Sequence, residues 1–224
     1  MQSNTPTAIG AYIDAAKICR RDTNSSGRAG SILAPERART ISPEEIFKHY
    51  GRLVSEDGKQ LALDSQTRSA LETAARWLQD PAAPWCLLLT GTPGTGKTTL
   101  LLAIRAALRA INARSVPDYY TALQVAEFNE TDRVRYSAIC RELSFVAIDD
   151  IGTEPARINL FGTERTPLKT ALEERYSSRL RTILTTNLGP REIRARYGDR
   201  IADRINDAAI VPYSGASYRG ARRE

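Results

Sequence analysis

Several features common in other proteins are scarce or missing in this chain of 224 residues. Its three cysteines, Cys19, Cys86 and Cys140, are odd in number and form no CxxC pair, so we expect neither a disulfide framework nor a zinc site. No apolar run approaches the roughly 20 residues of a membrane-spanning helix, and the N-terminus lacks a signal-peptide pattern. We therefore expect a cytoplasmic protein without a membrane partner.

Lysine is also scarce, because the 32 basic residues are 27 Arg and only 5 Lys. The net charge is +6, and residues 157–224 carry all of the excess, with 14 basic and 8 acidic residues. Arginine can hold phosphates with two parallel hydrogen bonds, so this basic region is compatible with nucleic-acid binding. Pairing of these Arg with acidic residues on a solvated surface is an equally good interpretation.

The chain divides into three predicted parts. Residues 1–41 are expected to be a flexible segment, in which residues 8–19 have the apolar spacing of a short partner-binding helix and residues 21–40 form a polar linker. Residues 42–84 are expected to be the helical N-terminal part of the folded region, and residues 85–224 its core.

Two helices are predicted within residues 42–84. The first begins after Ser42 as N-cap, with Pro43 in its first turn, and is expected to end at Gly51. The second is expected to run from Asp64 or Ser65 to Gln79.

From Trp85 onward, short apolar strands alternate with helical patterns. Such alternation indicates parallel βαβ units and an α/β fold. Strands are predicted at 85–90, 116–121, 145–149, 182–186 and 210–212, and helices at 97–112, between 121 and 143, at 167–178 and at 190–206.

The strongest motif is GTPGTGKT, which fits the P-loop pattern GxxxxGK[ST] in full. Glycines allow the backbone N–H groups to turn toward a phosphate, and the positive end of the following helix faces the same anion. Lys97 is expected to reach the β- and γ-phosphates of the nucleotide, and the Thr98 hydroxyl to bind Mg²⁺. The predicted nucleotide-binding residues are Gly91, Thr92, Pro93, Gly94, Thr95, Gly96, Lys97, Thr98 and Thr99.

A second motif is the sequence FVAIDD, four apolar residues followed by two acids, which is a Walker B pattern. A buried strand would carry Asp149 and Asp150 to the edge of the sheet at which α/β proteins bind ligands. We expect Asp149 to hold Mg²⁺ and Asp150 to orient the attacking water. Asn187, at the end of a later strand, is a candidate sensor of the γ-phosphate or a cap of the next helix. The absence of an NKxD motif favours ATP over GTP.

These residues, together with ILTTNL, RYGDRIADRI and VPYSGASYR, resemble the AAA+ ATPases of the DnaC/DnaI helicase-loader type and the related IstB-like transposition ATPases. The resemblance covers about residues 85–219. It implies an AAA+ ASCE P-loop fold, a three-layer sandwich around a five-stranded parallel sheet of order 5-1-4-3-2. Only twelve residues follow Pro212, so we expect no C-terminal lid domain, and self-association that depends on ATP and a partner.

The resemblance also implies further site residues. The arginine finger that completes the ATP site of a neighbouring subunit maps onto Arg204, with Arg200 one helical turn earlier. Local pairing of both with nearby aspartates is the alternative. Arg219 matches the closing motif of the family and is expected to contact the phosphates.

The expected function is that of an ATPase that loads a replicative helicase onto single-stranded DNA, with ATP as the switch between assembly and release. One alternative is an ATPase that assists a DNA transposase. Another is an ATP-dependent DNA-binding regulator with negligible turnover. Asp150 stands where many AAA+ enzymes have Glu, so we expect ATP hydrolysis to be slow.

Arg133, Arg135 and Tyr136 are candidate DNA contacts. Trp77 and Trp85 are expected to pack in the core and beside the adenine rather than to stack on DNA bases.

Overall fold

The computed structural model describes residues 41–58, 64–160 and 163–213. The helices are α2 (Pro43–Glu56), α3 (Ser65–Gln79), α4 (Lys97–Ala110), α5 (Ala122–Thr131), α6 (Arg133–Arg141), α7 (Pro167–Ser177), α8 (Pro190–Tyr197) and α9 (Asp199–Asn206). The strands are β1 (Cys86–Gly91), β2 (Asp118–Thr121), β3 (Phe145–Ile151), β4 (Ile158–Leu160), β5 (Thr163–Arg165), β6 (Arg181–Thr186) and β7 (Ala209–Tyr213).

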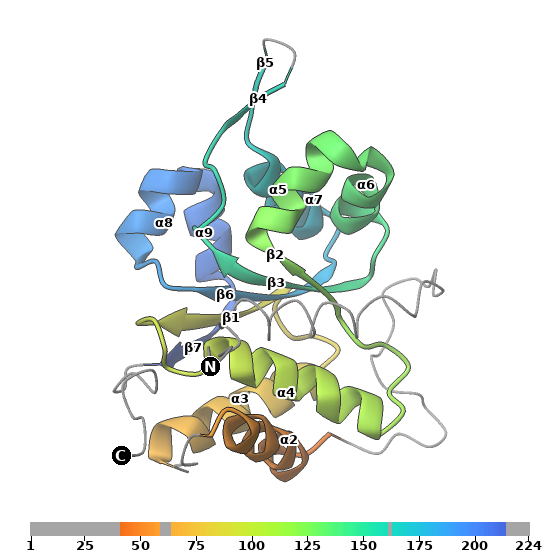
Figure 1. The fold of residues 1–224 in the computed structure, drawn as a ribbon, viewed down its shortest axis with the longest axis vertical. Helices are drawn as coiled ribbons and strands as arrows, with labels where there is room; N and C mark the ends of the chain where they lie inside the picture. The colour runs from red at the N-terminus through yellow and green to blue at the C-terminus, as the bar shows by residue number, and fades with distance from the viewer. Residues whose placement is uncertain (1–40, 59–63, 161–162, 214–224) are drawn as a thin grey trace, which may run out of the picture.

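A five-stranded parallel sheet forms the middle layer, in the order β2-β3-β6-β1-β7. Counted along the core as strands 1 to 5, this is the order 5-1-4-3-2, so the prediction is confirmed. Helices α2, α3 and α4 cover one face, and α5 to α9 cover the other, which gives three layers (Figure 1). No helical lid follows β7 within the residues that the structure describes.

Alternate residues of each strand point into two separate hydrophobic clusters. Leu87 and Leu89 of β1 pack with α2, α3 and α4, whereas Cys86 and Leu88 pack with the helices of the opposite face. This alternation follows from the two-residue period of a strand. Because Ile46, Tyr50 and Leu71 share the first cluster with α4, helices α2 and α3 pack directly on the rest of the fold.

The predicted stop at Gly51 is wrong. Helix α2 continues to Glu56, because Ile46, Tyr50 and Val54 form one buried stripe at i, i+4 spacing that runs past the glycine. Burial of Val54 outweighs the roughly 1 kcal/mol by which an interior glycine weakens a helix. The second helix begins at Ser65, as predicted, and Asp64 caps it, since its carboxylate accepts the Thr67 N–H at 2.7 Å.

The antiparallel β4–β5 hairpin between β3 and α7 was not predicted. It projects from the rest of the molecule beyond α5 and α7 (Figure 1). The predicted helix at 8–19, the linker at 21–40 and Arg219 lie outside the described residues. No described helix is long and apolar enough to cross a membrane.

Arg175 joins three elements of the fold from inside the core. Its buried guanidinium donates to the carbonyl oxygens of Ile139 at the end of α6 and Leu143 beyond it, to Arg181 O, and to Thr182 Oγ1 in β6. Burial lowers the pKa of Arg175 to about 9, so the side chain stays protonated at neutral pH.

We expect Arg175→Met to destabilise the protein strongly. The substitution removes these four hydrogen bonds and leaves buried acceptors without donors, each costing about 1–3 kcal/mol, partly offset by loss of a buried charge. A net loss of about 3 kcal/mol corresponds to a melting temperature lower by roughly 6–12 °C in thermal unfolding. Arg76→Met, on the exposed side of α3, is the matched control, and an equal effect of both would contradict this role.

Candidate functional site

The predicted motifs meet at the carboxyl ends of β1, β3 and β6. The P-loop follows β1, the two aspartates end β3, and Asn187 follows β6. These strands are neighbours, since β6 pairs with both β1 and β3. The strand order reverses at this position, which is the usual place for a ligand in an open α/β sheet.

The P-loop has the backbone that phosphate binding requires. Gly91, Gly94 and Gly96 all have positive φ, of 144°, 83° and 97°. A Cβ on Gly91 would lie 1.9 Å from Tyr213 O of β7, so only glycine fits there. Helix α4 begins at Lys97, which places its N-terminal N–H groups at the loop. The Lys97 ammonium donates to Gly91 O at 2.8 Å and to Thr92 O at 2.7 Å.

Asp149 lies beside the P-loop, as its predicted role requires. Its carboxylate is 1% exposed and accepts hydrogen bonds from the hydroxyls of Thr98 (3.1 Å), Thr185 (2.5 Å) and Tyr119 (2.9 Å). Burial raises the pKa of Asp149, and these three hydrogen bonds oppose that shift. A divalent cation at this carboxylate would favour its ionised form.

Asp150 and Asn187 lie side by side. Asn187 Nδ2 donates to Asp150 Oδ1 at 2.9 Å, which joins the predicted water-orienting group to the predicted sensor. Asp150 has a φ of 61°, which is unusual for a residue other than glycine and coincides with an irregularity between β3 and β6. Its N–H donates to Thr185 Oγ1 at 2.7 Å.

Thr185, Tyr119 and Tyr50 are parts of the site that the sequence analysis missed. Thr185 links the two aspartates, because it donates to one and accepts from the other. Tyr50 of α2 lies against the P-loop, where a Cβ on Gly96 would come within 2.6 Å of its hydroxyl oxygen. The position of Thr185 at the end of β6 was a usable signal. The two tyrosines had none, because they reach the site from distant segments.

The residues present fit a nucleotide with Mg²⁺. The Thr98 hydroxyl and the Asp149 carboxylate are in contact and are the hard oxygen ligands that Mg²⁺ prefers. The loop needs its glycines, because a Cβ on Gly91 would clash with Tyr213 and one on Gly96 with Tyr50. Thr98 and Asp149 would hold the metal, which would neutralise phosphate charge, and Lys97 would hold the phosphates.

Arg204 does not reach the site of its own subunit. Its guanidinium lies over the Tyr176 ring, 4.4 Å from the centroid, and Nη1 is 3.5 Å from Glu173 O. The Arg204 carbonyl accepts the Trp85 indole N–H at 3.1 Å. Trp85 precedes β1, so about six residues at ~3.3 Å each separate this end of the sheet from the P-loop.

Within the described residues, neither Arg200 nor Arg204 pairs with the aspartates of α9. Asp199 and Asp203 both pair with Arg194 of α8, and Asp207 accepts the Tyr176 hydroxyl at 3.3 Å. Arg200 is exposed.

Two other predictions need correction. Trp85 was expected beside the adenine, but it is buried at the amino end of β1, opposite the P-loop. Tyr136 was a candidate platform for DNA bases, but it is half-buried and its hydroxyl donates to Pro167 O at 2.7 Å. The Arg135 guanidinium lies 5.2 Å from the Phe128 ring centroid and pairs with Asp132.

Comparison with family models and with curated proteins found no match for this sequence. Solved structures share its fold. DnaI is 22% identical with a TM-score of 0.54, over 71% of this chain and 88% of DnaI. The DnaC helicase loader is 19% identical with a TM-score of 0.51, over 69% of this chain and 93% of that one. Replication initiator DnaA, bound to AMPPCP and single-stranded DNA, is 15% identical with a TM-score of 0.52, over 81% of this chain and 52% of DnaA. The chain therefore has the same fold as DnaI and DnaC.

Proposed function

We propose that this protein is a Mg²⁺-dependent ATPase that loads a replicative helicase onto single-stranded DNA. The observation that carries the proposal is the complete set of P-loop, paired aspartates and Asn187 on a DnaC/DnaI-like fold. The likeness extends over 88% of the solved DnaI chain and 93% of the solved DnaC chain. It extends over 52% of the solved DnaA chain.

Each residue of the site has a role in this proposal. Lys97 and the P-loop N–H groups bind the phosphates, and Thr98 and Asp149 hold Mg²⁺. Asp150, oriented by its hydrogen bond with Asn187, accepts a proton from the attacking water. Asp150 is one methylene shorter than Glu, so turnover is slow until a partner or DNA tightens the site.

Arg204 is proposed to act on the nucleotide of a neighbouring copy. Its position near the amino end of β1 excludes contact with its own P-loop but leaves it close to the molecular surface, where it is partly exposed. To reach a neighbour, the guanidinium would leave the Tyr176 ring. Arg200, exposed one turn earlier on α9, is the second candidate for the same contact.

The partner is tested by mixing the full-length protein with the replicative helicase of its own source. Size-exclusion chromatography with mass detection is run with ATP and Mg²⁺, with ADP, and without nucleotide. We expect a complex whose yield depends on ATP, because ATP is proposed to favour assembly and its hydrolysis release. Lys97→Ala is the control, and its complex yield is expected not to respond to ATP.

Absence of a helicase complex in all conditions would contradict the loader proposal. The same experiment with the transposase of the source then tests the transposition alternative. ATP-dependent complex formation without any phosphate release, even with DNA present, would instead support a regulator with negligible turnover.

A further inference from the structure

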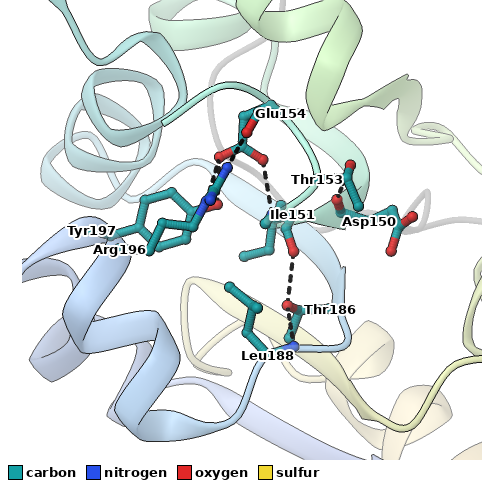
Figure 2. Close-up of polar contacts among 9 residues, drawn as sticks. Asp150, Ile151, Thr153, Glu154, Thr186, Leu188, Arg196 and Tyr197 are labelled. Carbon is teal, nitrogen blue, oxygen red and sulfur yellow. Dashed lines mark hydrogen bonds and ion pairs between the residues drawn. The ribbon is translucent and has the colours of Figure 1, made fainter. Parts of the chain in front are cut away.

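Glu154 is a buried carboxylate that the proposed ATPase mechanism does not use. It lies four residues after Asp150 and is 2% exposed. A buried carboxylate is costly unless it is paired and hydrogen-bonded. Its oxygens accept from Gly152 N–H (2.8 Å), from the Tyr197 hydroxyl (2.7 Å) and from Arg196 Nε (3.2 Å). Arg196 also donates to the Glu154 carbonyl, so two elements meet at this residue (Figure 2).

On one side, Glu154 holds the turn that carries Asp150. This turn contains two positive φ angles, 61° at Asp150 and 106° at Gly152. The first is unfavourable for a residue with a Cβ and must be held by its surroundings. Thr153 supplies one restraint, because its hydroxyl donates to Asp150 O at 2.8 Å. Glu154 supplies another by accepting the Gly152 N–H, and Figure 2 shows the Asp150 carboxylate pointing away from Arg196 and Tyr197.

The same turn is packed against the segment that carries Asn187. Thr186 Oγ1 donates to Ile151 O at 2.8 Å and accepts the Leu188 N–H at 3.0 Å. A Cβ on Gly152 would lie 2.6 Å from Leu188 Cδ1, so the two segments are in close contact (Figure 2). A shift of the turn would therefore change the hydrogen bond between Asp150 and Asn187.

On its other side, Glu154 is joined to the α8–α9 pair. Arg196 and Tyr197 are the last residues of α8, and α9, with Arg200 and Arg204, begins after Gly198. Arg194 binds Asp199 and Asp203, which ties the two helices together. A movement of α9 toward a neighbouring copy would be transmitted through Arg196 and Tyr197 to Glu154.

We propose that Glu154 is a positioning residue for ATP hydrolysis, which holds Asp150 and Asn187 in place and couples their geometry to helices α8 and α9 through Arg196 and Tyr197. This inference rests on the proposed ATPase function. A carboxylate is needed because three donors face this side chain: an N–H, a hydroxyl and a guanidinium. A carboxylate accepts hydrogen bonds with two oxygens, whereas the amide of a Gln accepts with only one.

The test compares Glu154→Gln with Glu164→Gln in the full-length protein with DNA and helicase. Glu164 is the matched control, because it pairs with Arg157 at 3.0 Å in the exposed β4–β5 hairpin. Single-turnover hydrolysis, the dissociation constant of Mg·ATP and the melting temperature are measured for each. We expect Glu154→Gln to slow hydrolysis about tenfold or more per folded molecule while ATP affinity changes less than about twofold. Glu164→Gln should change neither.

Tyr197→Phe removes a single donor and retains the carboxylate, so it serves if Glu154→Gln does not fold. It should slow hydrolysis by a smaller factor, and the double variant should be no slower than Glu154→Gln alone, because both act through one carboxylate. An unchanged rate of ATP hydrolysis in both variants would overturn the positioning role. A hydrolysis rate and an ATP affinity that fall together, in proportion to the loss of folded protein, would also overturn it. A wild-type protein that binds ATP without hydrolysing it would overturn the proposed function as well.

Discussion

Arg204→Ala is expected to reduce stimulated ATP hydrolysis by about 10³-fold or more, within the 10³–10⁵ range of arginine fingers in other NTPases. ATP binding by the isolated protein should stay within about twofold, because Arg204 lies over Tyr176, about 20 Å from its own P-loop at ~3.3 Å per strand residue. Turnover with helicase and single-stranded DNA and equilibrium nucleotide binding are the two measurements.

Arg179→Ala is the matched control for loss of packing. The Arg179 guanidinium also lies over the Tyr176 ring, 5.6 Å from the centroid, but on the connection between α7 and β6. A mixture of Arg204→Ala and Lys97→Ala proteins should regain part of the activity, since one supplies an intact P-loop and the other an intact finger. No recovery, together with weaker ATP binding by Arg204→Ala alone, would show that Arg204 acts within its own subunit.

Asp150→Asn is expected to slow hydrolysis by about 10²–10⁴-fold, the usual contribution of a general base. The amide oxygen can still accept from Asn187 Nδ2, but it cannot take a proton from water. Mg·ATP affinity should be preserved, because Asp149 and Thr98, which are proposed to hold the metal, are unchanged. Rapid-quench single-turnover assays and equilibrium titration separate the two effects.

Asp132→Asn is the control, because it removes the same charge at a distance from the site and Asn can still cap α6. The Asp132→Asn protein should hydrolyse ATP at the wild-type rate. If Asp150→Asn turned over as fast as the wild-type protein, another group would have to activate the water. If the protein is instead a regulator with negligible turnover, Asp150→Asn should not lower the rate of ATP hydrolysis further.

The nucleotide site was predictable where its signal was local. The P-loop and the two aspartates are contiguous in sequence, and their chemistry depends on a backbone pattern that a short motif specifies. The strand order came from the resemblance, because the amino-acid pattern predicts strands but not which of them are neighbours. The motifs and the strand order together predict that Lys97, Asp149 and Asn187 lie at one edge of the sheet.

Other features depended on contacts between distant segments. Glu154 appeared to be an ordinary turn residue, because its partners Arg196 and Tyr197 lie more than forty positions away, at separations of 42 and 43. The helix stop at Gly51 failed because packing of Val54 outweighed a local preference. Trp85 was predicted beside the adenine although it precedes β1, and the P-loop follows the other end of that strand.

The carboxyl edge of the sheet is proposed to be a working ATP·Mg²⁺ site. Phosphate release from ATP tests this proposal. It is measured for the full-length protein with the replicative helicase of its source and single-stranded DNA, with Mg²⁺ and after chelation, beside Lys97→Ala. We predict saturable release by the wild-type protein that requires Mg²⁺, and release at background from Lys97→Ala. Equal phosphate release by the wild-type protein and by Lys97→Ala would contradict this proposal, and so would a wild-type protein that neither binds nor hydrolyses ATP.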